Sequence, residues 1–333
     1  MILHPGILAL VLGASFVFLM TLFSAAIGGI IVLRWDFNSS SSYQLSLERR
    51  TYLISTIMNY VLGFQAVSLF LFLYVVDDLY KLFVGAMCAT GSLNANPIGW
   101  YALISKIAAF FCAGFWLALN SIDQRAEDYP LVRLKYILLL CITPLMGLDL
   151  FLQVAYFLGL DPDIITSCCG SLFSESGSGA ASSIASFPVH TSMILFYTVA
   201  GLFFASGGGC LYSKKGWLRY AFSAVAAVLF FCSLVAIISF ASIYIYELPT
   251  HHCPFDIIQK EYSFIGYPLY LSLFGTMFFA ILPGGFQPLK KNTSLKSIIT
   301  ISEKKWICHA MGWGGIFILL VSYSVLTSNL IYF

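Results

Sequence analysis

Long apolar runs recur along the whole sequence, and each can cross about 30 Å of hydrocarbon as a helix of roughly 20 residues. Hydrophobic residues make up 59% of the chain and charged residues 10%. So many apolar groups cannot be hidden inside a water-soluble globule. We therefore expect an all-α polytopic integral membrane protein with eight transmembrane helices. They are predicted at residues 7–33, 51–76, 99–121, 134–158, 190–212, 220–246, 265–285 and 306–331.

The segments between these runs predict the loops of a single transmembrane helical domain that covers residues 1–333. Three loops fall on one side of the membrane, at 77–98, 159–189 and 247–264. Four fall on the other side, at 34–50, 122–135, 213–219 and 286–305. Residues 1–33 lack a basic n-region and a small-residue cleavage site, which favours a retained first helix over a signal peptide.

The distribution of Lys and Arg predicts the orientation, because basic residues favour cytoplasmic loops. Lys81 and Lys260 lie in the first set of loops, and Lys106 lies inside a helix. The remaining basic residues lie in the second set, at Arg34, Arg49, Arg50, Arg125, Arg133, Lys135, Lys214, Lys215, Arg219, Lys290, Lys291, Lys296, Lys304 and Lys305. The second set is therefore predicted to be cytoplasmic, with both termini periplasmic, in a bacterial inner membrane.

The basic residues occur in small clusters between apolar runs, and the formal net charge is only +2. A nucleic-acid-binding protein would carry a basic face or stripe. We therefore expect the lipid bilayer, and no nucleic acid, as a partner.

Cysteines mark the predicted periplasmic loops. Four of the nine cysteines lie there, at Cys88, Cys168, Cys169 and Cys253, whereas the others lie in or near apolar runs and are read as small hydrophobes. Periplasmic cysteines meet an oxidising compartment in which disulfides persist. The sequence thus predicts a periplasmic cap built from three cysteine-bearing loops.

A redox relay is the first hypothesis for these cysteines. His251 and His252 directly precede Cys253, and a neighbouring imidazolium favours the thiolate that attacks disulfides. Cys253 would exchange with Cys88, Cys168 or Cys169, and the electrons would pass to a quinone in the membrane. The alternative is that these four cysteines form static disulfides, each worth roughly 2–4 kcal/mol.

The same segment is also a candidate metal site. Thiolate ligands together with His251, His252, Cys253 and Asp256 suit zinc or copper, and soft sulfur ligands favour Cu(I). The spacing His-His-Cys-x-x-Asp is not a specific signature, and adjacent residues rarely ligate one ion together. A haem-ligating role and simple solvated loop histidines stay open as further interpretations.

Polar residues also lie inside the predicted membrane spans. Lys106 and Asp149 fall at comparable depths on adjacent helices, and each alone costs about 2.5–3.5 kcal/mol in hydrocarbon. We expect them to face the helix bundle and to pair, with Gln65 and Gln153 nearby. Such a group would orient a quinone headgroup, form a proton path or hold helices together. The alternative is that Lys106 extends to the headgroups.

Ile-Gly-aromatic occurs at the start of two predicted helices, at Ile98-Gly99-Trp100 and Ile265-Gly266-Tyr267. An aromatic residue at headgroup depth and a glycine that permits close packing explain both occurrences without an internal duplication.

Residues 88–100 and 252–270 resemble a poorly characterised group of bacterial multi-pass membrane proteins, in which the third outer loop reads His-Cys-Pro-Phe-Cys before Gln-x-Glu-Tyr. More remotely, the chain is similar to quinone-linked thiol oxidases and vitamin K epoxide reductase-like proteins, which carry a Cys-x-x-Cys pair at the quinone. This chain has Asp256 where the second cysteine of that pair would stand.

These patterns together predict thiol/disulfide or electron-transfer chemistry at the periplasmic face, linked to a quinone. A periplasmic thioredoxin-like or other redox protein would then be the partner. The alternative is a non-catalytic membrane subunit or a metal-handling protein for copper, zinc or haem, whose cysteines are structural disulfides or ligands. A transporter would need a polar, broken-helix path through the membrane midplane, of which the sequence offers little.

Overall fold

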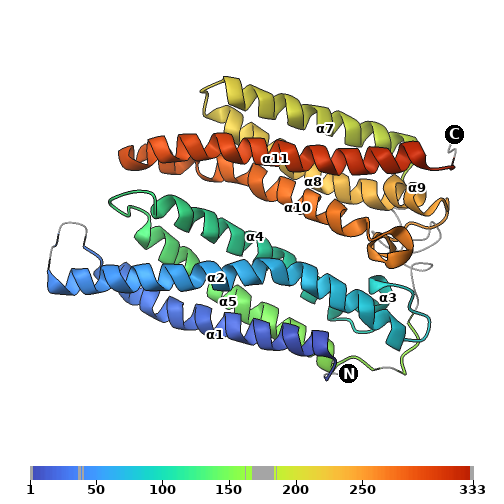
Figure 1. The fold of residues 1–333 in the computed structure, drawn as a ribbon, viewed down its shortest axis with the longest axis horizontal. Helices are drawn as coiled ribbons and strands as arrows, with labels where there is room; N and C mark the ends of the chain where they lie inside the picture. The colour runs from blue at the N-terminus through green and yellow to red at the C-terminus, as the bar shows by residue number, and fades with distance from the viewer. Residues whose placement is uncertain are drawn as a thin grey trace. The chain divides into compact units, whose positions relative to one another are not determined.

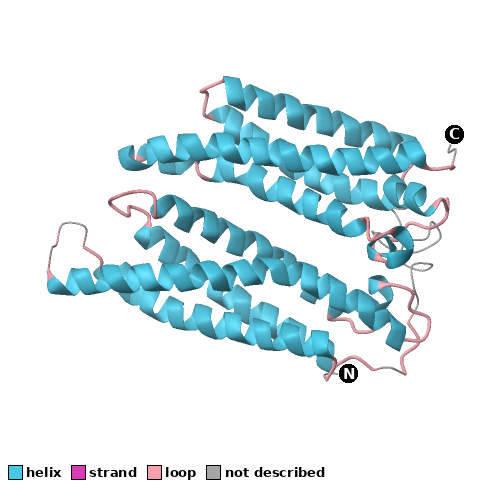
Figure 2. Cartoon of the chain, viewed as in Figure 1, coloured by secondary structure: helices cyan, strands magenta, loops and turns pink. Residues whose placement is uncertain are grey.

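The computed structural model describes residues 3–36, 39, 41–161, 163–166, 184 and 186–330. Within these residues the chain is all-α, and Figure 2 shows helices joined by loops without a strand. Among the described residues, eight helices are long and apolar enough to cross a membrane, which confirms the predicted architecture. A lipid bilayer is the environment that such helices require.

The chain divides into two compact units by its internal packing, and each is described by itself. The first contains Met1–Val76 and Leu93–Ile164. Its long helices are α1 (Pro5–Arg34), α2 (Ser42–Asp78, as far as Val76), α4 (Gly99–Asp123) and α5 (Val132–Leu158), which can be followed in Figure 1. The core between them includes Met58, Leu62, Ala113, Trp116 and Tyr136.

The second unit contains Asp77–Ser92 and Ile165–Phe333. Its long helices are α7 (Val189–Tyr212), α8 (Trp217–Ala236), α10 (Gly266–Gly285) and α11 (Thr293–Thr327). α8 continues through a π-helical turn, η2 (Ile237–Ala241), into α9 (Ser242–Tyr246). Aromatic rings fill the core, where Phe203 and Phe222 stack with ring centroids 5.1 Å apart.

Large apolar side chains cover the outside of the helices. Leu12, Leu19, Val67, Phe151 and Leu319 are each more than half exposed. A water-soluble protein rarely exposes so much apolar surface, whereas a lipid-facing surface requires it.

Two helices begin earlier than the apolar runs predicted. α2 begins at Ser42 and α11 at Thr293, so the predicted cytoplasmic loops 34–50 and 286–305 are largely helical. Hydropathy finds the part of a helix that crosses hydrocarbon, but charged helix formers extend the same helix beyond it. Lys135 and Arg219, which were predicted in loops, likewise lie in the first turns of α5 and α8.

Both Ile-Gly-aromatic motifs mark sites of close packing. A Cβ atom on Gly99 would clash with the carbonyl of Leu93 in α3 (Ala89–Asn94), and one on Gly266 would lie 2.6 Å from Ile258 Cγ2. Ile258 belongs to the short helix η3 (Asp256–Ile258). In each case a glycine lets the following long helix start directly against a short helical segment.

Substituting Gly266→Ala is expected to destabilise the protein by about 1–3 kcal/mol, because the added methyl overpacks the contact with η3. Gly201→Ala is the matched control, since its Cβ would meet no atom within 4 Å and alanine favours a helix. Thermal unfolding in detergent compares the two variants. Equal midpoints for both would contradict the close packing at Gly266.

Candidate functional site

The segment around Cys253 is a compact series of turns in the second unit. α9 ends at Tyr246, and Glu247 after it adopts a left-handed φ of 55°. The chain then passes through η3 and η4 (Lys260–Tyr262) to α10. Two buried tyrosines hold the backbone in place. Tyr246 donates to the carbonyl of Cys253 at 2.5 Å and Tyr270 donates to the carbonyl of Pro254 at 2.5 Å. Helices on either side thus fix the position of Cys253.

Cys88 lies beside Cys253, although the two are separated by 165 positions in the sequence. Their Sγ atoms are 3.4 Å apart, and both residues are fully buried. The segment that carries Cys88 is tied in place on both sides. Asp77 Oδ1 accepts the Ala89 amide at 3.1 Å, and Gln259 Nε2 donates to the Met87 carbonyl at 2.6 Å.

Two polar groups lie against the Cys253 sulfur. Cys253 Sγ accepts the Phe255 amide at 3.4 Å and lies 3.5 Å from the Thr90 hydroxyl. An amide dipole and a hydroxyl directed at sulfur stabilise negative charge on it. Cys253 is therefore well placed to be a thiolate.

An acid and an imidazole complete the cluster. Asp256 is buried, and its carboxylate lies within 4.8 Å of both sulfurs, so three potential ligand atoms converge. Asp256 Oδ2 lies 2.5 Å from His251 Nε2. The structure thus brings together Cys88, Cys253, Asp256 and His251 of the predicted site.

Aromatic rings enclose the imidazole side of the cluster. The Tyr246 ring packs edge-on against the rings of His251 and Tyr262, with ring centroids 4.7 Å and 4.6 Å apart respectively. Burial raises the pKa of the Tyr262 phenol, and the negative charge of Asp256 adds to the effect. The Tyr262 phenol therefore stays protonated, and its ring is a neutral neighbour of the Asp256 carboxylate.

His252 turns towards a different partner. Its Nδ1 lies 2.9 Å from the carbonyl of Ile238, which belongs to the π-helical turn η2. Because a carbonyl only accepts, Nδ1 carries the proton. Nε2 is buried and makes no hydrogen bond to the described residues. π-helical turns often occur at functional sites, and here one positions a histidine next to the cysteine loop.

The remaining predicted partners, Cys168 and Cys169, lie outside the described residues. Sequence reasoning named Cys88 as one of three partners for Cys253, without distinguishing among them. It missed Thr90, Tyr246 and Tyr270. A tyrosine on each helix next to the loop was the available signal, since a buried phenol needs an acceptor.

The predicted intramembrane group forms in the first unit. Lys106 Nζ donates to Asp149 Oδ2 at 2.8 Å, Gln65 Nε2 donates to the same oxygen at 3.0 Å, and the Ser105 hydroxyl donates to Oδ1 at 3.0 Å. Lys106 is 1% exposed, so it pairs inside the bundle and does not extend to the headgroups. Gln153 is buried one turn further along α5 and makes no side-chain hydrogen bond to described residues.

A second buried ion pair in the first unit was not predicted. Lys135 Nζ lies 2.7 Å from Asp123 Oδ2 and donates to Asn120 Oδ1 at 3.1 Å. Asp123 and Lys135 both fell in the predicted loop 122–135, where charged residues are read as solvated. The charge of Lys135 is instead neutralised within the protein.

No protein-family model, curated protein or solved structure matches this chain in comparisons with known proteins.

Proposed function

We propose that Cys88 and Cys253 form a redox centre that cycles between dithiol and disulfide, at the periplasmic face of a bacterial inner membrane. The observation that carries this proposal is the 3.4 Å separation of two buried sulfurs from distant segments. A disulfide has an S–S length of about 2.05 Å, so small side-chain movements suffice to form it.

The proposed oxidation removes two protons and two electrons from the pair as the S–S bond forms. A membrane quinone takes up the two protons and the two electrons and becomes a quinol. A dithiol on a periplasmic thioredoxin-like partner then reduces the disulfide again. Because neither sulfur is exposed, exchange with a protein partner requires the loop around Cys253 to open locally.

The surroundings suggest a role for each residue. Cys253 attacks as the thiolate, because the Phe255 amide and the Thr90 hydroxyl stabilise its charge. Asp256 lies within 4.8 Å of both sulfurs and receives a proton through one bridging water, while His251 holds the carboxylate in place. Cys88 supplies the second sulfur.

Metal binding is the second candidate, and the convergence of two sulfurs and one carboxylate within 4.8 Å favours it. Two thiolates suit Cu(I) or Zn²⁺, and Asp256 would add an oxygen ligand. His251 would then orient Asp256 from behind, as outer partners of metal ligands do.

A redox titration of the purified protein tests the proposal. The protein is equilibrated in dithiothreitol buffers of graded potential, thiols are trapped by alkylation, and peptides are identified by mass spectrometry. We expect one two-electron transition that interconverts free Cys88 and Cys253 with their disulfide. Thiols that stay reduced throughout, together with stoichiometric zinc or copper in the same preparation, would reject the redox centre in favour of the metal site.

A further inference from the structure

A cavity of about 350 Å³ lies in the first unit, and the proposed redox centre does not use it. It is formed where α1 ends, near the start of α2, and beside the connection between α4 and α5. Small-molecule sites typically occupy about 300–1,000 Å³. The cavity lies at the end of spanning helices, which is the depth of lipid headgroups.

The floor of the cavity is made of buried hydrogen-bonding groups. The hydroxyls of Thr51 and Ser55 lie one turn apart on α2 beside the Tyr136 phenol, and neither makes a hydrogen bond of ordinary geometry to the described residues. Lys135 also lines the cavity and is 1% exposed. Two of its N–H groups are directed at Asp123 and Asn120, which leaves the third as a donor.

Asp123 holds this arrangement together. One oxygen pairs with Lys135, and the other accepts the Leu131 amide at 2.8 Å. The connection between α4 and α5 is thereby held against the cavity. Tyr129, which belongs to this connection, adopts a φ of 44°. Left-handed backbone is uncommon for a bulky side chain and costs about 1 kcal/mol or more. The fold thus maintains a strained residue that places an aromatic ring in the cavity wall.

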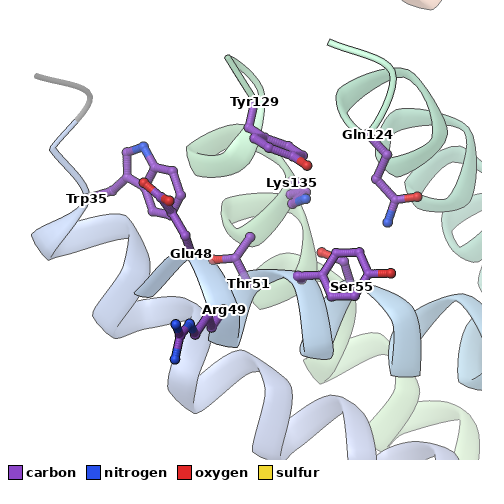
Figure 3. A pocket seen from close by; sticks show the side chains of 9 residues that line it. Trp35, Glu48, Arg49, Thr51, Ser55, Gln124, Tyr129 and Lys135 are labelled. Carbon is purple, nitrogen blue, oxygen red and sulfur yellow. The ribbon is translucent and has the colours of Figure 1, made fainter. Parts of the chain in front are cut away.

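The walls combine aromatic rings with charges of both signs. Figure 3 shows Trp35 and Tyr129 on different sides of the cavity, with Lys135 beside Tyr129 and Glu48 beside Trp35. Arg49 also belongs to the residues that line the cavity. Since Asp123 neutralises Lys135, the cavity has no large excess of either charge. Aromatic faces and a carboxylate attract an ammonium, and hydroxyls with Lys or Arg bind phosphate oxygens.

We propose that this cavity binds a zwitterionic group in which a phosphate and an ammonium are joined by a short linker. The phosphate lies on Thr51, Ser55 and Lys135, and the ammonium lies between Glu48 and the aromatic rings. A phosphatidylethanolamine headgroup and free phosphoethanolamine share this chemistry.

Binding is measured by tryptophan fluorescence of the full chain in dodecyl maltoside, with Trp35→Phe identifying the contribution of Trp35. The titrants are short-chain phosphatidylethanolamine, phosphatidylglycerol of the same chain length, and phosphoethanolamine. We expect saturable binding of at least one ethanolamine compound and weaker binding of phosphatidylglycerol. Tighter binding of the lipid assigns the site to a headgroup, and equal binding of phosphoethanolamine assigns it to a soluble ligand. Equal affinity for the two lipids would overturn the proposal.

Two variants localise the ligand. Glu48→Gln is expected to weaken ethanolamine binding about tenfold, which corresponds to about 1.4 kcal/mol, whereas Glu127→Gln, at an exposed residue outside the cavity lining, leaves it unchanged. Tyr129→Gly is expected to abolish saturable binding without lowering the thermal midpoint, because glycine adopts a φ of 44° without strain. Wild-type affinity in both Glu48→Gln and Tyr129→Gly would show that the cavity is not the site.

Discussion

Replacing Lys106 by Met is expected to destabilise the protein by about 3–5 kcal/mol, because it leaves the buried carboxylate of Asp149 without its cation. Gln65 and Ser105 still donate to Asp149, but two neutral donors do not replace a full charge at 2.8 Å. Inside a membrane the carboxylate has no water to compensate the loss. Thermal unfolding in detergent measures the effect.

The double variant Lys106→Met with Asp149→Leu is expected to recover much of the lost stability, since buried ion pairs contribute little over apolar residues of similar volume. Lys81→Met serves as the control, because the Lys81 ammonium pairs with Asp78 in an exposed position and such pairs are worth little. A Lys106→Met variant as stable as Lys81→Met would contradict the buried pair.

Substituting Cys253→Ala is expected to abolish the two-electron redox transition completely, because the disulfide loses one of its sulfurs. Cys88→Ala removes the same transition but leaves Cys253 with its Phe255 and Thr90 contacts. We therefore expect the remaining Cys253 thiol in Cys88→Ala to be alkylated faster than a thiol without such contacts once the loop opens.

Cys141→Ala and Cys308→Ala are the matched controls, since both residues are exposed helix residues remote in sequence from the cluster. Both variants are expected to retain the wild-type transition. A transition that survives in Cys253→Ala, or that disappears in Cys141→Ala, would assign the redox chemistry to other sulfurs.

The sequence predicted the spanning helices because apolar runs of this length have few alternatives in water or membrane. It also predicted the pairing of Lys106 with Asp149, since two opposite charges at similar depth in hydrocarbon have strong reason to meet. The free energies of apolar burial and of charge pairing in the membrane are large, so residue types and their spacing are enough to predict both.

The features that the sequence did not predict depend on smaller contributions to the free energy. Asp123 and Lys135 form a buried pair at the end of two helices, and composition alone does not distinguish such a pair from solvated loop charges. The choice of Cys88 as the neighbour of Cys253 depends on turns held by Tyr246, Tyr270 and Gln259, each through single hydrogen bonds to backbone carbonyls. The left-handed conformation of Tyr129 has no local sequence signal, because tyrosine disfavours it.

Thiol trapping in native membranes tests the redox centre most directly. Membranes are prepared without reductant from cells with and without quinone biosynthesis, thiols are alkylated at once, and the Cys88–Cys253 disulfide peptide is quantified by mass spectrometry. We predict that the disulfide is abundant when quinone is present and falls severalfold when it is absent, with free Cys88 and Cys253 rising equally. A Cys88–Cys253 pair in the same state in both membranes, whether fully oxidised or fully reduced, would contradict a quinone-linked centre.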